Sequence, residues 1–416
     1  MSNDSHTNDI PPHRLEQRRL AIGMLPLSDA APLVVAVHNG LFAAEGLDVT
    51  LTVEASWANI RDKMQLGALD AAQMLALMPL ASSLGLDGRR TAMVSAMTLN
   101  LNGNAITVSK GVHQQMVKLA PGLTGETVSM AAALAQVIAT RRRQGMEPLR
   151  FASVYPFSSH RYLLRYWLAS AGIDPDRDLD LRVVPPPQMA AQLESGRIDG
   201  YCVGDPWNTM AAERDSGVVL ASSDDIWQNG QEKVLGVREE WAQANPNTHR
   251  AMLRALIRAC AWLDADLDHR RQAASLLADG GYLDVPPHII ERTLVAGGLA
   301  HGVLFHRYAA NFPWRSHTLW FALQMVRWGH LAQAGDLAAA VARCTRPDLY
   351  RQAAAELGIA CPDDDMKSEG EHAAPWTLPS ANGTLTLGPD GFLDGARFDP
   401  ARLDDYLAMF RTVARP

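Results

Sequence analysis

The chain has 416 residues, of which 47% are hydrophobic and 20% are charged. This composition is ordinary for globular proteins and excludes a disordered, collagen-like or coiled-coil chain. The 38 Lys and Arg against 45 Asp and Glu give a net charge of −7, whereas a sequence-independent nucleic-acid binder needs a surplus of cations. The length favours two or three domains, and direct nucleic-acid binding by the whole surface is not expected.

Four cysteines stand far apart in the sequence, at Cys202, Cys260, Cys344 and Cys361. No two of them have the CxxC spacing of a redox or zinc site, and a chain of this length does not need disulfides to fold. We interpret them as reduced thiols of a cytosolic protein. The sequence contains no apolar run of about 18 residues, so no membrane-spanning helix is expected.

The N-terminal segment 1–17 is polar and is expected to be disordered. Arg18 and Arg19 then precede the apolar run LAIGMLPL, a pattern that is similar to a twin-arginine export signal. Pro26 and a following Ser-Asp pair interrupt the run, and no small-x-small cleavage site follows at a suitable distance. We therefore expect a cytoplasmic protein.

From residue 18 onward, short apolar runs alternate with amphipathic stretches in a βαβα order, which predicts a mostly parallel sheet covered by helices. The first unit has predicted strands at 18–25, 47–54, 68–75, 91–97 and 104–109, and predicted helices at 32–46, 59–67 and 78–85. The second unit has predicted helices at 127–145, 158–172, 187–196 and 205–217, and predicted strands at 149–156, 179–185, 197–204 and 218–223. Beyond residue 225 the pattern is strongly helical, and the tail from 362 is rich in turns.

One short motif occurs once in each unit. Segments 67–71 and 196–200 share the form G-x-[IL]-D-[AG] between a helix and a strand. A glycine that ends a helix and an aliphatic residue that starts a strand explain each copy. Two copies nevertheless favour two similar α/β lobes with a ligand cleft between them.

These observations predict an α/β, bilobal architecture of two doubly wound lobes. Lobe I comprises 18–107 and 232–335, lobe II comprises 108–231, and 336–416 form a helical and irregular C-terminal extension that packs on the lobes.

No P-loop, GxGxxG, HExxH or GxSxG motif occurs, and no Cys/His set has metal-ligand spacing. An enzyme is therefore not expected, nor are a metal or a cofactor. Polar and aromatic residues instead mark the junctions of strands and helices, where doubly wound folds bind ligands: Trp57, Asn104, His160, Pro186, Asp205 and Lys233.

Several long motifs occur in a characteristic order between residues 20 and 357. They read LPLSDAAPLVVA, ASWANIRDKM, RYWLASAGIDPD, VVPPPQMAAQL, DGYCVGDPWN and FPWRSHTLWFALQMVRWG. With these motifs the chain resembles the nitrate- and bicarbonate-binding proteins of ABC-type solute uptake, which implies a type II fold like that of periplasmic binding proteins.

Exported members of that family carry a secretory or lipoprotein signal, which this sequence is not expected to have. The chain therefore resembles the cytoplasmic nitrate/nitrite sensor branch of NasS type. Members of that branch hold an RNA-binding antiterminator with an ANTAR domain (NasT type) and release it when the anion binds, which controls nitrate-assimilation genes.

The resemblance also implies a set of anion-binding positions in this sequence: Trp57, Asn104, His160, Pro186, Val203, Gly204 and Lys233. Uptake proteins more often have glutamine where Asn104 stands, so this contact is expected to be longer or water-mediated. The bicarbonate branch has a glutamate and a bound calcium ion where Lys233 stands, so lysine favours direct anion binding without metal.

The chemistry of nitrate agrees with these residue types. Nitrate is a planar monoanion with three acceptor oxygens, so a site needs a positive charge, N–H donors and a flat wall, which Lys233, His160 and Trp57 can supply. Taken singly, Asn104 and Pro186 favour structural roles, Asn104 as a turn residue, and the alternative for Lys233 is a solvated surface pair with Glu232. Together with the family resemblance, Lys233, His160 and Trp57 favour a functional role. The alternatives are an uptake receptor, an enzyme on the same fold, and a bicarbonate-binding protein.

Overall fold

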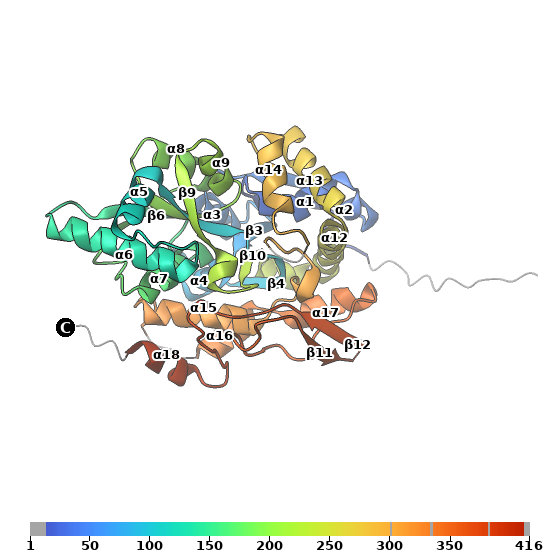
Figure 1. The fold of residues 1–416 in the computed structure, drawn as a ribbon. Coiled ribbons are helices and arrows are strands. Elements are labelled where there is room, and N and C mark those ends of the chain that lie inside the picture. The colour runs from blue at the N-terminus through green and yellow to red at the C-terminus, as the bar shows by residue number, and fades with distance from the viewer. Residues whose placement is uncertain (1–13, 300–301, 333–335, 382, 412–416) are drawn as a thin grey trace, which may run out of the picture.

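Two five-stranded sheets with the same strand order form the centre of the molecule (Figure 1). The computed structural model describes residues 14–299, 302–332, 336–381 and 383–411. The first sheet has the order β2-β1-β3-β10-β4, and the second has the order β7-β6-β8-β5-β9. In each sheet the fourth strand is antiparallel to its neighbours, while β1 runs parallel to β2 and β3, and β6 runs parallel to β7 and β8. The mostly parallel sheets predicted from the sequence thus each contain one inserted antiparallel strand.

Lobe I is built on the first sheet. Its strands are β1 (Arg19–Met24), β2 (Asp48–Val53), β3 (Ala71–Leu75), β4 (Met93–Leu101) and β10 (Gln231–Arg238). Its helices are η1 (Ser28–Ala30), α1 (Ala31–His38), α2 (Leu41–Ala44), α3 (Trp57–Leu66), α4 (Met78–Leu84), α11 (Glu239–Ala244), α12 (Pro246–Ala265), α13 (Leu267–Asp279) and α14 (Pro287–Val295). Every residue of β3, β4 and β10 is buried, as expected for strands covered on both faces.

Lobe II is built on the second sheet. Its strands are β5 (Asn104–Ser109), β6 (Leu149–Ser153), β7 (Leu179–Val183), β8 (Gly200–Gly204) and β9 (Gly217–Ser222). Its helices are α5 (Lys110–Leu119), α6 (Thr127–Arg143), α7 (Ser159–Ser170), η2 (Pro186–Gln188), α8 (Met189–Glu194), α9 (Trp207–Glu213) and α10 (Ser223–Ile226).

The chain changes lobes twice, between β4 and β5 and between β9 and β10. The first change falls between Leu101 and Asn104, earlier than the predicted boundary after residue 107, because β5 pairs with β8 and β9 of the second sheet. The second change ends at Gln231, one residue before the predicted boundary. Each crossover strand therefore begins next to the junction of the lobes.

The repeated motif at 67–71 and 196–200 has the same structure in both lobes. Gly67 and Gly196 both have left-handed backbones, with φ of 74° and 67°. The carboxylate of Asp70 accepts a hydrogen bond from the backbone N–H of Ala21 on β1, and that of Asp199 accepts one from the backbone N–H of Arg150 on β6, each at 2.8 Å. Both copies therefore join a helix to the sheet in the same way.

The C-terminal extension forms a layer beneath both lobes in Figure 1. The elements of this part are η3 (Arg307–Ala309), α15 (Arg315–Arg327), α16 (Leu337–Cys344), α17 (Pro347–Glu356), β11 (Trp376–Ser380), β12 (Gly383–Leu387) and α18 (Leu403–Arg411). The extension therefore begins before the predicted boundary at 336, because η3 packs on β12 and α15 packs on α16 and α18. It reaches lobe I through α16 and α17, which pack on β4, and it reaches lobe II where Tyr166 of α7 donates a hydrogen bond to Asp394 at 2.9 Å.

Most of the N-terminal segment that was expected to be disordered, 1–13, lies outside the described residues. Its last residues are ordered: Glu16 accepts hydrogen bonds from Asn247 and Thr248 at the start of α12, and Gln17 bonds to Asp70. The expectation of disorder is therefore wrong for 14–17, because these side chains cap a helix. Among the described residues, no helix is both long and apolar enough to span a membrane.

Candidate functional site

The centre of the candidate site is Lys233, which is fully buried on β10 in lobe I. Its Nζ donates hydrogen bonds to Asp29 Oδ2 at 2.8 Å and to Glu232 Oε1 at 2.7 Å. The same nitrogen lies 5.7 Å from the centroid of the Trp57 ring, close enough for a cation–π interaction. Three segments distant in sequence thus bring one cation, two carboxylates and a flat aromatic wall together.

The charges in this cluster depend on one another. Burial alone would lower the pKa of Lys233, but the carboxylates of Asp29 and Glu232 outweigh it and raise that pKa above its ordinary value. Burial raises the pKa of Asp29, and Lys233 opposes this shift. Lys233 therefore carries a positive charge. Without it, the carboxylates of Asp29 and Glu232 would be buried without a compensating charge.

Lobe II contributes His160 from the first turn of α7, where Ser158 accepts a hydrogen bond from the backbone N–H of Arg161 and caps the helix. The imidazole Nδ1 lies 3.3 Å from Glu232 Oε1, across the junction of the lobes. Burial and the positive charge of Lys233 lower the pKa of His160 well below its usual value. His160 is thus a neutral imidazole in contact with the charged cluster.

Asn104 and Gly204 form the wall of the site on lobe II, as directly paired residues of β5 and β8. A Cβ atom placed on Gly204 would lie 3.4 Å from Asn104 Oδ1 and 3.7 Å from Asp29 Oδ2, so Gly204 lies directly between these side chains. The backbone N–H of Asn104 donates to Ser223 Oγ at 3.3 Å, which fixes the start of β5. The backbone of Gly204 thus lies next to both Asn104 and Asp29.

Several buried polar atoms around Lys233 have no hydrogen-bond partner within the part of the chain that the structure describes. They are Trp57 Nε1, His160 Nε2, Asn104 Nδ2 and Asn104 Oδ1. A buried polar atom without a partner costs about 1–3 kcal/mol, and such atoms are rare in folded proteins. Nitrogen atoms of this kind next to a buried ammonium group are suited to hold a small anion.

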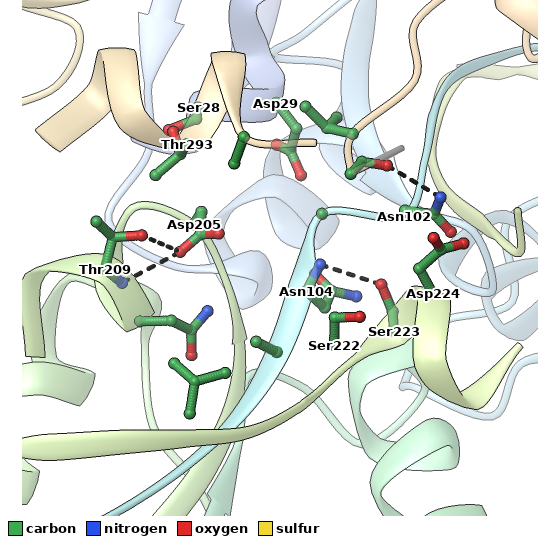
Figure 2. Close-up of a pocket in the computed structure, with 17 residues that line it drawn as sticks. Ser28, Asp29, Asn102, Asn104, Asp205, Thr209, Ser222, Ser223, Asp224 and Thr293 are labelled. Carbon is green, nitrogen blue, oxygen red and sulfur yellow. Dashed lines mark hydrogen bonds between the residues drawn. The ribbon is translucent and has the colours of Figure 1, made fainter. Parts of the chain in front are cut away.

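A cavity of about 390 Å³ adjoins this cluster between the lobes and shares Asp29 and Asn104 with it (Figure 2). Asp205 lines the cavity from lobe II, and burial raises the pKa of its carboxyl group to about 6, against the hydrogen bonds from Thr209. No lysine, arginine or histidine occurs among the described residues that line it. Lys233, His160 and Trp57 do not line the cavity, so Asp29 and Asn104 are the residues that connect it with the cluster.

Contacts between the lobes surround the site. The backbone N–H of Ser28 donates to the carbonyl of Asp205 at 2.9 Å. Farther out, the Tyr155 hydroxyl of lobe II donates to Asp87 of lobe I at 3.1 Å, and burial raises the pKa of Tyr155, so the hydroxyl stays protonated. The lobes are therefore in a closed arrangement around the cluster.

Five of the seven positions carried over from the family resemblance come together in this cluster: Trp57, Asn104, His160, Gly204 and Lys233. The other two, Pro186 on η2 and Val203 on β8, are buried, and the Val203 carbonyl accepts a hydrogen bond from Asn208 at 2.8 Å. The part of all seven residues in binding stays a prediction.

The interpretation of Lys233 and Glu232 as a solvated surface pair is wrong, because both side chains are at most 1% exposed. Sequence reasoning missed Asp29 and gave Glu232 no role in the site. Asp29 stands directly after β1 in LPLSDAAPLVVA, and this position at a strand's carboxyl end was the signal available. The described residues contain no group of three or more His, Cys, Asp or Glu that is arranged to hold a metal ion.

Two lobes of matching topology around a buried polar cluster define the periplasmic-binding-protein-like fold. Residues 13–278 match the model of the NMT1-like family, and the chain therefore belongs to this family. The bilobal α/β fold predicted from the sequence is confirmed by the solved structure described next.

The relatives specify the family further. The chain is 40% identical over 373 residues to the "Nitrate import ATP-binding protein NrtC" of Synechocystis sp., which covers 86% of this chain and 52% of NrtC. It thus spans about half the length of this relative. It is 31% identical over 414 residues to the "Nitrate/nitrite binding protein NrtA" of Synechococcus elongatus, which covers 94% of this chain and 86% of NrtA.

Among solved structures, the crystal structure of the periplasmic nitrate-binding protein NrtA from Synechocystis has a TM-score of 0.83 and 27% identity, and the match covers 96% of this chain and 100% of that one. The resemblance to nitrate- and bicarbonate-binding proteins is thus confirmed at the level of the family. NrtA is named as a binding protein, which supports a non-enzymatic role at that level.

Proposed function

We propose that this chain binds nitrate or nitrite in the buried cluster between its lobes. One observation carries the proposal: Trp57 Nε1, His160 Nε2 and Asn104 Nδ2 lack partners around the buried ammonium group of Lys233. A flat oxyanion with acceptors on every side would satisfy Trp57 Nε1 and Asn104 Nδ2, and it would satisfy His160 Nε2 when that nitrogen carries a hydrogen. The names of NrtA and NrtC, which refer to nitrate, support the choice of anion.

The charge of the cluster favours a small monoanion. Lys233 already interacts with two carboxylates, so a divalent anion such as sulfate would add two further negative charges to a buried site. Burial of uncompensated charge is costly, and the cost rises with its amount. The site therefore suits nitrate or nitrite better than sulfate.

Isothermal titration calorimetry of the full chain against nitrate, nitrite, bicarbonate and sulfate, with a chelator present, tests this proposal. Nitrate or nitrite is expected to bind without added metal, and Lys233→Glu is expected to abolish binding because it reverses the only cationic group of the cluster among the described residues. Lys110→Glu is the matched control, since Lys110 is half-exposed on lobe II and pairs with Asp215. Binding that requires calcium and prefers bicarbonate would instead assign the chain to the bicarbonate branch.

We further propose that the chain is a cytoplasmic sensor, which releases an ANTAR-type antiterminator when the anion binds and thereby controls nitrate-assimilation genes. Release requires that the anion and the partner prefer different states of the lobes, with a coupling of about 1–3 kcal/mol. The second candidate is the solute-binding receptor of an ABC system for nitrate or bicarbonate, which the name NrtA favours.

Thermodynamic linkage between anion binding and partner binding distinguishes the sensor from the uptake receptor. A sensor must bind nitrate more weakly when the antiterminator is bound, by the same factor by which nitrate weakens the antiterminator complex. Titrating nitrate into the purified chain with and without the partner measures this factor, which is expected to be about 5–150. Equal nitrate affinities in the two titrations, together with a processed and exported chain in cell fractions, would establish the uptake receptor.

A further inference from the structure

The carboxylate of Glu232 lies between two basic groups of the site. Its Oε1 lies 2.7 Å from Lys233 Nζ and 3.3 Å from His160 Nδ1, and all three side chains are at most 1% exposed. A carboxylate accepts hydrogen bonds and cannot donate them, so the ring nitrogen that faces it carries the hydrogen. The hydroxyl of Ser159, 3.4 Å from the same Nδ1, can accept as well as donate and does not oppose this arrangement.

This tautomer has a consequence for the other ring nitrogen. With the hydrogen on Nδ1, the neutral imidazole of His160 presents a lone pair at Nε2, and Nε2 has no partner among the described residues. Nitrate and nitrite have acceptors only, so a bare Nε2 would face the bound anion acceptor against acceptor. His160 can donate to such an anion only after Nε2 gains a proton.

We propose that binding of nitrate or nitrite takes up one proton onto Nε2 of His160, and that Glu232 positions the ring for this step. Neutral His160, one solvent proton and one anion combine to an imidazolium–anion pair, and no covalent bond to the anion forms or breaks. Glu232 acts as a positioning residue, because its negative charge, 3.3 Å from Nδ1, favours a hydrogen on that nitrogen and stabilises the imidazolium that results. The inference rests on the proposed function, since it concerns the same anion.

The charged groups around the imidazole of His160 do not compensate the negative charge of a bound anion, so a proton is needed. His160 faces Glu232 and Lys233 of β10, and Lys233 is bound by Asp29 of η1. Trp57 of α3 adds no charge, and burial raises the pKa of the Cys202 thiol on β8 well above its usual value, so the thiol stays neutral. An anion that enters beside one ammonium group and two carboxylates adds negative charge, which one proton offsets.

In the protein without an anion, His160 is neutral and can therefore take up a proton when the anion binds. Burial and Lys233 lower the pKa of His160 well below the ordinary 6.5, so the ring is neutral at pH 7 before the anion arrives. A bound anion at Nε2 raises that pKa, because an adjacent negative charge favours the protonated ring. Affinity for nitrate is therefore expected to fall as the pH rises.

The same geometry separates two classes of anion. Bicarbonate has an O–H group, which can donate to the lone pair of Nε2 while the ring stays neutral. Nitrate and nitrite have no such donor and depend on the added proton. The number of protons taken up per bound anion thus distinguishes a site for nitrate or nitrite from a site for bicarbonate.

Calorimetry of the full chain with nitrate, in two buffers of different ionisation enthalpy and at several pH values from about 6 to about 8.5, tests the proposal. Uptake of about one proton is expected, with affinity falling about tenfold per pH unit. His160→Gln carries an amide that donates without titrating, so it is expected to bind nitrate with no pH dependence. Glu232→Gln is expected to weaken binding and to flatten the pH profile, while His113→Gln on α5 keeps the wild-type profile.

Two outcomes would overturn the proposal: nitrate binding that takes up no proton, or a pH dependence that persists in His160→Gln and so belongs to another group. Ring ¹⁵N shifts of His160 in the unmodified chain give a second measurement that needs no variant. The Nδ1–H tautomer is expected without nitrate and the imidazolium with it. If no anion binds at any pH, the proposed function fails; if nitrate binds independently of pH, only the proton uptake fails.

Discussion

The two lobes share one topology but contribute different chemistry to the site. In both sheets a crossover strand lies fourth, and the segments that follow equivalent strands reach the cluster. Asp29 follows β1 where His160 follows β6. Trp57 follows β2 where Pro186 follows β7, although Pro186 is not among the residues of the cluster. The crossover strand β10 carries Lys233, whereas β5 carries Asn104.

The difference lies in charge. Lobe I supplies the ammonium group and both carboxylates, while lobe II supplies the neutral side chains of His160 and Asn104. The salt bridge from Lys233 to Asp29 and Glu232 forms within one lobe and does not depend on closure. In the proposed function, lobe I therefore supplies the cation, and lobe II supplies neutral groups that complete the hydrogen bonds of the anion.

The largest expected effect comes from removing the cation of lobe I. Lys233→Met leaves the carboxylates of Asp29 and Glu232 buried without a partner, which is expected to lower the free energy of unfolding by about 3–5 kcal/mol. Urea denaturation measures this loss. The double variant Asp29→Asn with Lys233→Met is expected to regain part of the stability but no nitrate binding, and retained binding in either variant would contradict the division between the lobes.

A second effect concerns Glu369 in the C-terminal extension, which contacts both lobes. Burial would raise the pKa of Glu369, but Lys367 and His317 outweigh it and lower that pKa from 4.5 to about 2. Because the folded pKa is depressed, the stabilisation is complete above 4.5 and is lost as the pH falls from there to about 2. Thermal unfolding across this range is expected to show a loss of about 3 kcal/mol. Glu369→Gln is expected to be less stable at neutral pH and to lose less on acidification; an unchanged profile would exclude this residue as the cause.

The equivalence of the lobes predicts a matched pair of variants. Asp70→Ala and Asp199→Ala each remove the acceptor of one backbone N–H, from Ala21 and Arg150 respectively. Each is expected to lower the free energy of unfolding by about 1–3 kcal/mol, with nitrate affinity unchanged. Unequal losses in urea denaturation would show that the repeated motif serves the two lobes differently.

The smallest expected effect concerns a neutral donor of lobe II. Asn104→Ala removes an amide that has no partner among the described residues, so stability is expected to stay nearly constant. Nitrate affinity is expected to fall about tenfold, the cost of one hydrogen bond to a charged ligand. Calorimetry with Asn104→Gln, which restores an amide, is expected to recover most of the affinity. An unchanged affinity in Asn104→Ala would place the amide outside the site.

Much of the fold follows from local patterns in the sequence. Helix-ending glycines such as Gly67 and Gly196, and the alternation of strands and helices, predict two α/β lobes, because these signals act over a few residues. The lobe boundary was misplaced after residue 107, because the pairing of β5 with β8 is a long-range contact that strand periodicity does not reveal.

The site was predictable in its individual positions but not in its electrostatics. The motifs of the family indicated Trp57, His160 and Lys233. They did not indicate that Asp29, 204 residues away in sequence, binds Lys233, or that Glu232 faces inward. Such contacts depend on how β1 and β10 lie in one sheet, which no local pattern contains.

The positions of Asn104 and Lys233 on the crossover strands have a consequence for motion. Both residues lie beside the two connections about which the lobes must rotate, close to the pivot of that movement. Atoms near a pivot travel little, while the outer rims of the lobes sweep through the longest arcs. An anion bound between Asn104 and Lys233, as proposed, would lie where the displacement is smallest. A small rotation of the lobes about this point would produce a larger displacement at their outer surfaces.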